Sequence, residues 1–80
     1  SSTELRCLSE LALRENVDSV RFYEDMVDQE VFKNPQSTRN FINRMIKDKF
    51  IIKENRLIRL NIPDIETENP AVFTISLGLL

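Results

Sequence analysis

The chain is poor in the residues that build most catalytic and metal sites. Its 80 residues include no histidine, no tryptophan, one cysteine and one glycine. Without histidine, the chain lacks the side chain whose pKa suits acid–base catalysis near neutral pH. A single cysteine with no histidine excludes, within the chain, a disulfide, a Cys–His nucleophile pair and a structural zinc site. Because Cys7 falls on the apolar side of a predicted helix, we expect a reduced, intracellular setting.

Phosphate-binding loops and membrane spans are missing as well. The single glycine, Gly78, cannot form a glycine-rich phosphate loop. No apolar run approaches the roughly 20 residues that a membrane-spanning helix needs. Acidic pairs such as Glu24–Asp25 fall on helix positions that we expect to face water. We therefore predict no enzyme, no cofactor, no bound metal, no small-molecule substrate and no membrane partner.

The residues that are present match a small folded domain. A chain of this length supplies one hydrophobic core and too little material for a deep catalytic cleft. Its composition, 41% hydrophobic and 30% charged, is ordinary for a globular protein. The sequence begins Ser-Ser-Thr without a methionine, so we expect a segment of a longer protein, with that protein's other domains among its partners.

The stretch from Asn34 to Leu60 predicts a helix over residues 35–48 followed by a β-hairpin over 50–60. Asn34 suits the N-cap, and Pro35 suits the first helical position. Two β-prone runs then flank Glu54–Asn55, a spacing that fits a hairpin turn. The predicted buried side of the helix has a 3.6-residue period, with Phe41 and Met45 at its centre, and comprises Thr38, Phe41, Ile42, Met45 and Ile46.

Two further helices are predicted ahead of this stretch, over residues 3–15 and 19–32. Ser1 with Glu4 can cap the first helix, and Asp18 or Ser19 can cap the second. The first helix should bury Leu5, Leu8, Leu11, Ala12 and Leu13. The second should bury Val20, Tyr23, Met26, Val27 and Val31, with an acidic outer side.

The last 18 residues divide into two parts. Residues 63–70 are predicted to be an acidic linker that follows the hairpin. Residues 71–80 are apolar, and their pattern fits a strand and a helix equally well. We expect this segment to pack on the domain formed by residues 1–62 or on an adjoining domain.

Charge is distributed unevenly along the chain, whose net charge is -2. Residues 1–35 contain four basic and eight acidic residues, whereas residues 36–61 contain seven basic and two acidic ones. The positive excess therefore falls on the third helix and the hairpin. Two alternatives remain open: an ordinary solvated helix face, and edge-strand charges that discourage aggregation. The candidate nucleic-acid contacts are Arg39, Asn40, Asn43, Arg44, Lys47, Lys53, Arg56 and Arg59.

From Thr3 to Leu60 the pattern resembles the winged helix-turn-helix superfamily, an α+β fold of three helices and a two-stranded β-wing. Many members have glycine near the position of Lys49, which this chain lacks. The run STRNFINRMIKDKFI also resembles the winged helix of the central chromatin-binding region of meiotic HORMA-domain chromosome-axis proteins. In both, a Thr-Arg pair opens the third helix and Met-x-x-Asp precedes the wing. This resemblance implies a nuclear, meiotic role in tethering the chromosome axis to chromatin.

These observations leave three classes of function. In the first, the third helix and wing contact the phosphates of duplex DNA or a nucleosome, with weak affinity. In the second, the fold binds protein and touches no nucleic acid. The third is a bacterial-type transcription regulator, which we rank last because the sequence offers no dimerisation helix or effector pocket. A continuous positive surface on the helix and wing would favour the first class, and an exposed apolar patch there the second.

Overall fold

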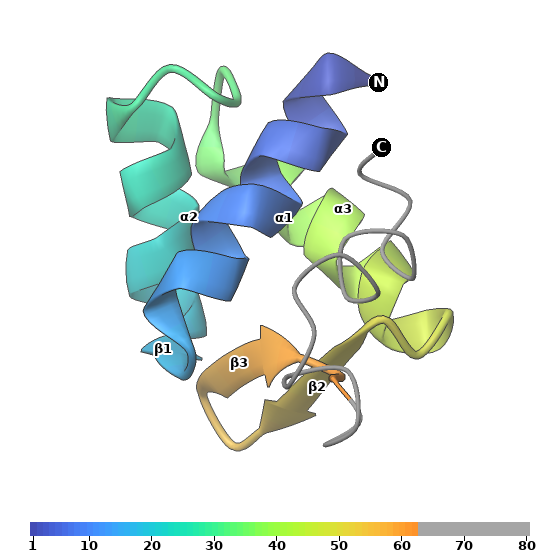
Figure 1. The fold of residues 1–80 in the computed structure, drawn as a ribbon. Helices are drawn as coiled ribbons and strands as arrows, with labels where there is room; N and C mark the ends of the chain where they lie inside the picture. The colour runs from blue at the N-terminus through green and yellow to red at the C-terminus, as the bar shows by residue number, and fades with distance from the viewer. Residues whose placement is uncertain (63–80) are drawn as a thin grey trace.

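The computed structural model describes residues 1–62, which form three helices and a small antiparallel sheet (Figure 1). This α+β architecture confirms the predicted fold class, with a winged-helix-like arrangement of its elements. The predicted linker 63–70 and apolar segment 71–80 lie outside the described residues. In chain order the elements are α1 (Ser2–Arg14), β1 (Val17–Asp18), α2 (Ser19–Asp28), α3 (Pro35–Lys47), β2 (Ile51–Glu54) and β3 (Leu57–Leu60).

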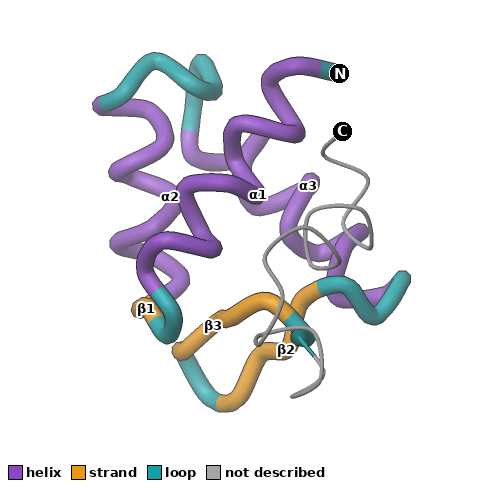
Figure 2. Tube along the Cα trace, viewed as in Figure 1, coloured by secondary structure: helices purple, strands orange, loops and turns teal. Residues whose placement is uncertain are grey.

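The sheet has three strands in the order β1-β3-β2, one more than the predicted two-stranded wing. In the β2–β3 hairpin Ile51 pairs with Leu60, and β1 adds to the other edge of β3, where Val17 pairs with Ile58. The prediction missed β1 because a two-residue strand is too short to show a period of two. The sheet lies at one end of the helices (Figure 2).

Helices α2 and α3 begin at the predicted residues, and α1 begins at Ser2, one residue before its predicted start. The side chains of Ser1, Asp18 and Asn34 each accept a hydrogen bond from the backbone amide three residues later, at 3.3, 3.1 and 2.9 Å. Pro35 occupies the start of α3. These caps satisfy amides that have no partner inside the helix.

Helix α2 ends at Asp28, four residues before the predicted end. The amides of Glu30 and Val31 turn back to the carbonyls of Val27 and Met26, at 2.9 and 2.8 Å, and Glu30 has a φ of 59°. This pair of bonds is a Schellman motif, in which a left-handed residue stops the helix. Buried Val31 therefore reaches the core from outside the helix.

Helix α3 ends by the same device. The amides of Lys49 and Phe50 donate to the carbonyls of Ile46 and Met45, at 3.0 and 2.9 Å. Lys49 has a φ of 68°, so it takes the left-handed conformation that glycine adopts more easily. The left-handed conformation of Lys49 thus sets the direction in which the chain leaves α3 and enters the wing.

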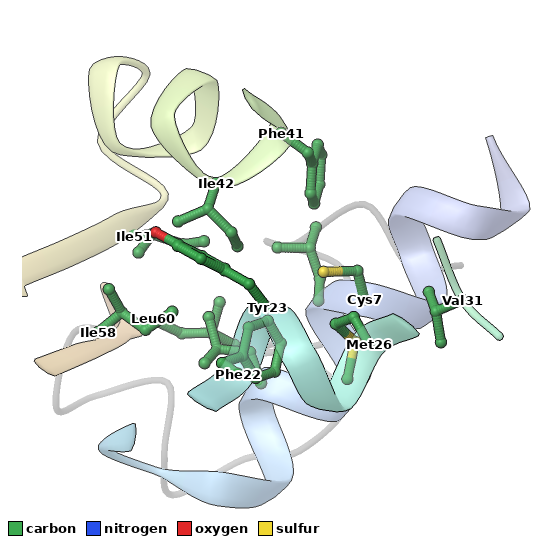
Figure 3. Close-up of a cluster of buried hydrophobic side chains, with 12 residues drawn as sticks. Cys7, Phe22, Tyr23, Met26, Val31, Phe41, Ile42, Ile51, Ile58 and Leu60 are labelled. Carbon is green, nitrogen blue, oxygen red and sulfur yellow. The ribbon is translucent and has the colours of Figure 1, made fainter. Parts of the chain in front are cut away.

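The hydrophobic core receives side chains from all three helices and from the hairpin (Figure 3). Phe22, Met26 and Ile42 are completely buried, and Phe41 retains 4% exposure. The Phe41 ring also packs against Phe32, with 6.0 Å between ring centroids. Met45 is only partly buried, so the prediction that it lies at the centre of the core is wrong.

The buried faces of α1 and α2 are narrower than predicted. Leu5, Leu13 and Val20 were expected in the core, but they are 38%, 81% and 38% exposed. The buried residues of α1 are Cys7, Leu8 and Leu11, and Cys7 and Leu11 are fully buried. Leu13 lies two positions from buried Leu11, a separation of about 200° around an α-helix, and therefore points away from the core.

Candidate nucleic-acid interface

The outward face of α3 is polar along its whole length. Gln36, Asn40, Asn43 and Lys47 are all exposed, and their spacing of four, three and four residues aligns them on one side of the helix. The 13 residues of α3 include three basic and no acidic side chains. This row is opposite the core residues Thr38, Phe41 and Ile42. The predicted buried side of α3 is thereby confirmed for Thr38, Phe41 and Ile42, whereas Met45 and Ile46 are only partly buried.

Arg39 and Arg44 lie on the two sides of this row, and each reaches back toward another helix. The Arg39 guanidinium lies over the Tyr23 ring of α2, 5.7 Å from its centroid. The Arg44 guanidinium is 5.4 Å from the centroid of the Phe41 ring and forms an ion pair with Glu4 of α1. Both arginines remain exposed at the borders of the outward face.

The two asparagines differ in their contacts. The Asn40 side-chain oxygen accepts a hydrogen bond from the Gln36 side-chain amide at 2.8 Å, so this oxygen is already engaged within α3. Asn43 is exposed, and its side chain makes no hydrogen bond with another described residue. A free carboxamide on a presented helix can donate and accept toward a base edge or a phosphate oxygen.

Arg56, at the hairpin turn, is tied to the start of α2. Its guanidinium Nε lies 3.0 Å from Asp18 Oδ1, and its carbonyl accepts the Ser19 amide at 2.6 Å. Because Asp18 also caps α2 by accepting the Arg21 amide, one carboxylate fixes both the helix and the wing. The Arg21 amide, and after it the Arg56 guanidinium, lower the pKa of Asp18 below its usual 3.8, although burial opposes the shift.

The remaining wing cations point to opposite sides of the sheet. Lys53 pairs in register with Ile58, whereas Arg59 pairs with Ile52, the next position along β2. Arg59 donates to Glu54 across the hairpin at 3.3 Å. Lys53 is exposed and makes no ion pair with a described residue. The wing therefore does not present its three cations on one surface.

The structure thus groups some of the eight predicted residues and separates others. Arg39, Asn40, Asn43, Arg44 and Lys47 share one continuous surface of α3. Three arginines, Arg44, Arg56 and Arg59, are bound to carboxylates. Lys53 and Arg59 face different sides of the wing.

The sequence did not predict the carboxylates that bind Arg44 and Arg56. Glu4 is 40 residues from Arg44, and Asp18 is 38 from Arg56, so no local spacing indicates either pair. Asp18 was singled out only as a helix cap. Lys49 was noted for its conformation, although its exposed side chain adds a cation where the wing begins.

Other chemistry is sparse in the described part of the chain. Burial raises the pKa of the Cys7 thiol to about 12, so the thiol stays protonated at neutral pH. Within residues 1–62, no group of three or more Cys, Asp and Glu side chains is placed to hold a metal ion. None of the described helices has both the length and the apolar character needed to span a membrane.

Comparisons of the chain with protein-family models, with curated proteins and with solved structures find no match. The interpretation of the surface therefore rests on its own geometry and charge.

Proposed function

We propose that this domain is a non-enzymatic nucleic-acid-binding module of a larger nuclear protein, with the outward face of α3 on duplex DNA or a nucleosome. The observation that carries the proposal is the exposed surface of α3, which has cations and carboxamides but no carboxylate. Phosphate oxygens accept hydrogen bonds from such side chains. From the resemblance of the run STRNFINRMIKDKFI to meiotic chromosome-axis proteins, we further propose a role in tethering the chromosome axis to chromatin.

The ion pair at Arg44 is compatible with this role. The side chains of Arg44 and Glu4 are 55% and 38% exposed, and surface pairs of this kind contribute about 0–1 kcal/mol to stability. A phosphate can therefore replace the Glu4 carboxylate at small cost. In the free protein the pair holds the guanidinium at the border of the α3 surface.

The wing contributes fewer contacts than the helix. Arg56 is held by both Asp18 and Ser19, which fixes the hairpin turn against α2. Lys53 has no described ion-pair partner and is the wing cation most available to phosphate. If about four cations meet phosphates, the slope of log K against log salt is about -3 to -4, and binding is micromolar or weaker at physiological salt.

A second candidate is a protein-binding winged helix. Phe50, just before β2, and Leu57, in β3, are each 43% exposed, and a partner protein could cover such apolar side chains. The ion pairs at Arg56 and Arg59 also reduce the free positive charge of the wing. In this alternative α3 and the wing touch no nucleic acid.

Fluorescence anisotropy with a short labelled duplex tests the proposal. The variant carries Lys47→Glu and Lys53→Glu, both at exposed positions without an ion-pair partner among the described residues. We expect weaker binding on every sequence tested, with a salt slope about 2 units shallower than that of the wild type, one unit for each lost phosphate contact.

The matched control is Arg21→Glu with Lys33→Glu. These residues are also exposed, lie outside α3 and the wing, and change the net charge by the same amount. We expect the control to keep the wild-type slope. If both variants lost the same amount of DNA affinity, the effect would come from net charge alone and would contradict the proposed α3 surface. If the wild-type protein did not bind DNA, the nucleic-acid proposal would be wrong and the protein-binding candidate would remain.

A further inference from the structure

A groove lies between the carboxyl-terminal half of α1 and the end of β3. Its volume is about 410 Å³. The floor is formed by Leu11 and Leu60, which are almost fully buried, and the rim by partly buried Ala12 and Ile62 together with polar side chains. The groove is therefore apolar at its base and open to solvent above.

The chain itself leads out of this groove. Ile62, which lines it, is the last described residue, so residue 63 begins at the groove. Eight residues, 63–70, separate Ile62 from the apolar segment 71–80. When extended, these eight residues span up to about 26–29 Å, which is ample for the chain to turn back to the groove.

The segment 71–80 has the composition of an occupant for this surface. It has the sequence AVFTISLGLL, without any charged residue, and Phe73 is its largest apolar side chain. Exposed in water, these side chains would form an unpaired apolar surface. The stretch before them contains Asp64, Glu66 and Glu68, and one cation, Arg59, is among the residues that line the groove.

We propose that residues 71–80 dock intramolecularly in the groove between α1 and β3, with Phe73 over Leu11 and Leu60. Attachment through a short linker gives an effective concentration in the millimolar range, well above that of a second copy at micromolar protein concentration. The groove is too small for ten residues, so Phe73 and its immediate neighbours occupy it. This inference does not rest on the proposed nucleic-acid function.

The test is an NMR measurement on the full 80-residue chain. Nuclear Overhauser effects between the Phe73 ring and the methyl groups of Leu60 and Ile62 are expected. A sample that mixes isotope-labelled and unlabelled chains separates contacts within a chain from contacts between chains. Contacts found only between chains, contacts of Phe73 with another surface, or no contacts at all would each overturn the proposal.

A pair of variants supplies an independent readout. Phe73→Asp should move the Leu60 and Ile62 methyl resonances and raise hydrogen exchange around the groove. Ser76→Asp adds the same charge at a polar position of the same segment and should leave both unchanged. Equal effects of the two substitutions, or no effect of Phe73→Asp, would contradict docking through Phe73.

Discussion

Helices α2 and α3 have similar ends and similar core-facing residues, but their solvent-facing sides differ in charge. Each begins at an Asx cap, Asp18 or Asn34, and each ends in a Schellman turn around a left-handed residue, Glu30 or Lys49. Each places a phenylalanine in the common core. On the outer side, however, α2 carries three acidic residues and α3 carries none.

We propose that this difference separates the residues that fold the domain from those that would contact a partner. Caps, turns and buried aromatics stabilise both helices in the same way, so they say nothing about function. The outer faces make little contribution to the core, and their charge is free to suit a partner. An acidic α2 is repelled by phosphate, whereas α3 can approach it.

The substitutions Phe22→Ala and Phe41→Ala test whether α2 and α3 contribute equally to the common core. Both rings are buried, at 0% and 4% exposure, and each truncation should cost about 3–5 kcal/mol of unfolding free energy, measured by urea denaturation. Asn43→Ala, on the outward face of α3, should change stability by less than about 0.5 kcal/mol. A loss below about 1 kcal/mol for Phe41→Ala would show that α3 does not share the core of α2.

The shared helix ends predict a gain from glycine. A left-handed conformation costs a non-glycine residue about 1–2 kcal/mol, and glycine loses about 0.5–1 kcal/mol more entropy on folding. Glu30→Gly and Lys49→Gly should therefore each stabilise the domain by up to about 1 kcal/mol in thermal or urea unfolding.

Asn55, with a φ of 57°, supplies the control for these two substitutions. Because asparagine tolerates the left-handed region, Asn55→Gly should gain less than either of them. If Glu30→Gly or Lys49→Gly destabilises the domain, the left-handed side chain contributes a contact that outweighs its backbone strain.

The helix starts differ in one respect, since Asp18 titrates and Asn34 does not. The folded state lowers the pKa of Asp18, so its carboxylate stabilises the fold above the usual pKa of 3.8, and that contribution is lost as the pH falls through the lowered value. Asp18→Asn should reduce the difference in unfolding free energy between neutral and strongly acidic pH. Asn34→Asp should add acid sensitivity at α3. An Asp18→Asn protein with the acid sensitivity of the wild type would contradict this role.

The sequence-based predictions succeeded for features that depend on residues close together in the chain and failed for features that depend on distant residues. The caps Ser1, Asp18 and Asn34 accept hydrogen bonds from amides three residues away; Ser1 and Asn34 were predicted, and Asp18 was one of the two candidates for its helix. Strand β1 is stabilised by pairing with β3, about 40 residues distant, and it was missed. The end of α2 was also misplaced, because a glutamate in the left-handed conformation gives no signal comparable to glycine.

The candidate site shows the same limit. The polar row on α3 follows from helical period alone, and three of its residues, Asn40, Asn43 and Lys47, were among the predicted contacts. The ion pairs that engage Arg44 and Arg56 join distant elements, so the sequence overstated the free charge of the surface. Successive side chains of a strand point to opposite faces of the sheet, and the register of β2 with β3 therefore places Lys53 and Arg59 on different faces. The two β-prone segments of the sequence did not by themselves determine this register.

The central claim is that α3, and not α2, faces nucleic acid. The most direct measurement is an amide NMR titration of the domain with a short DNA duplex at low salt, repeated at physiological salt. The account predicts shift changes along the outward face of α3, from Gln36 to Lys47, and weaker ones in the wing, while the amides of Glu24 and Asp28 on α2 stay in place. Changes confined to α2, or none at either salt concentration, would contradict it.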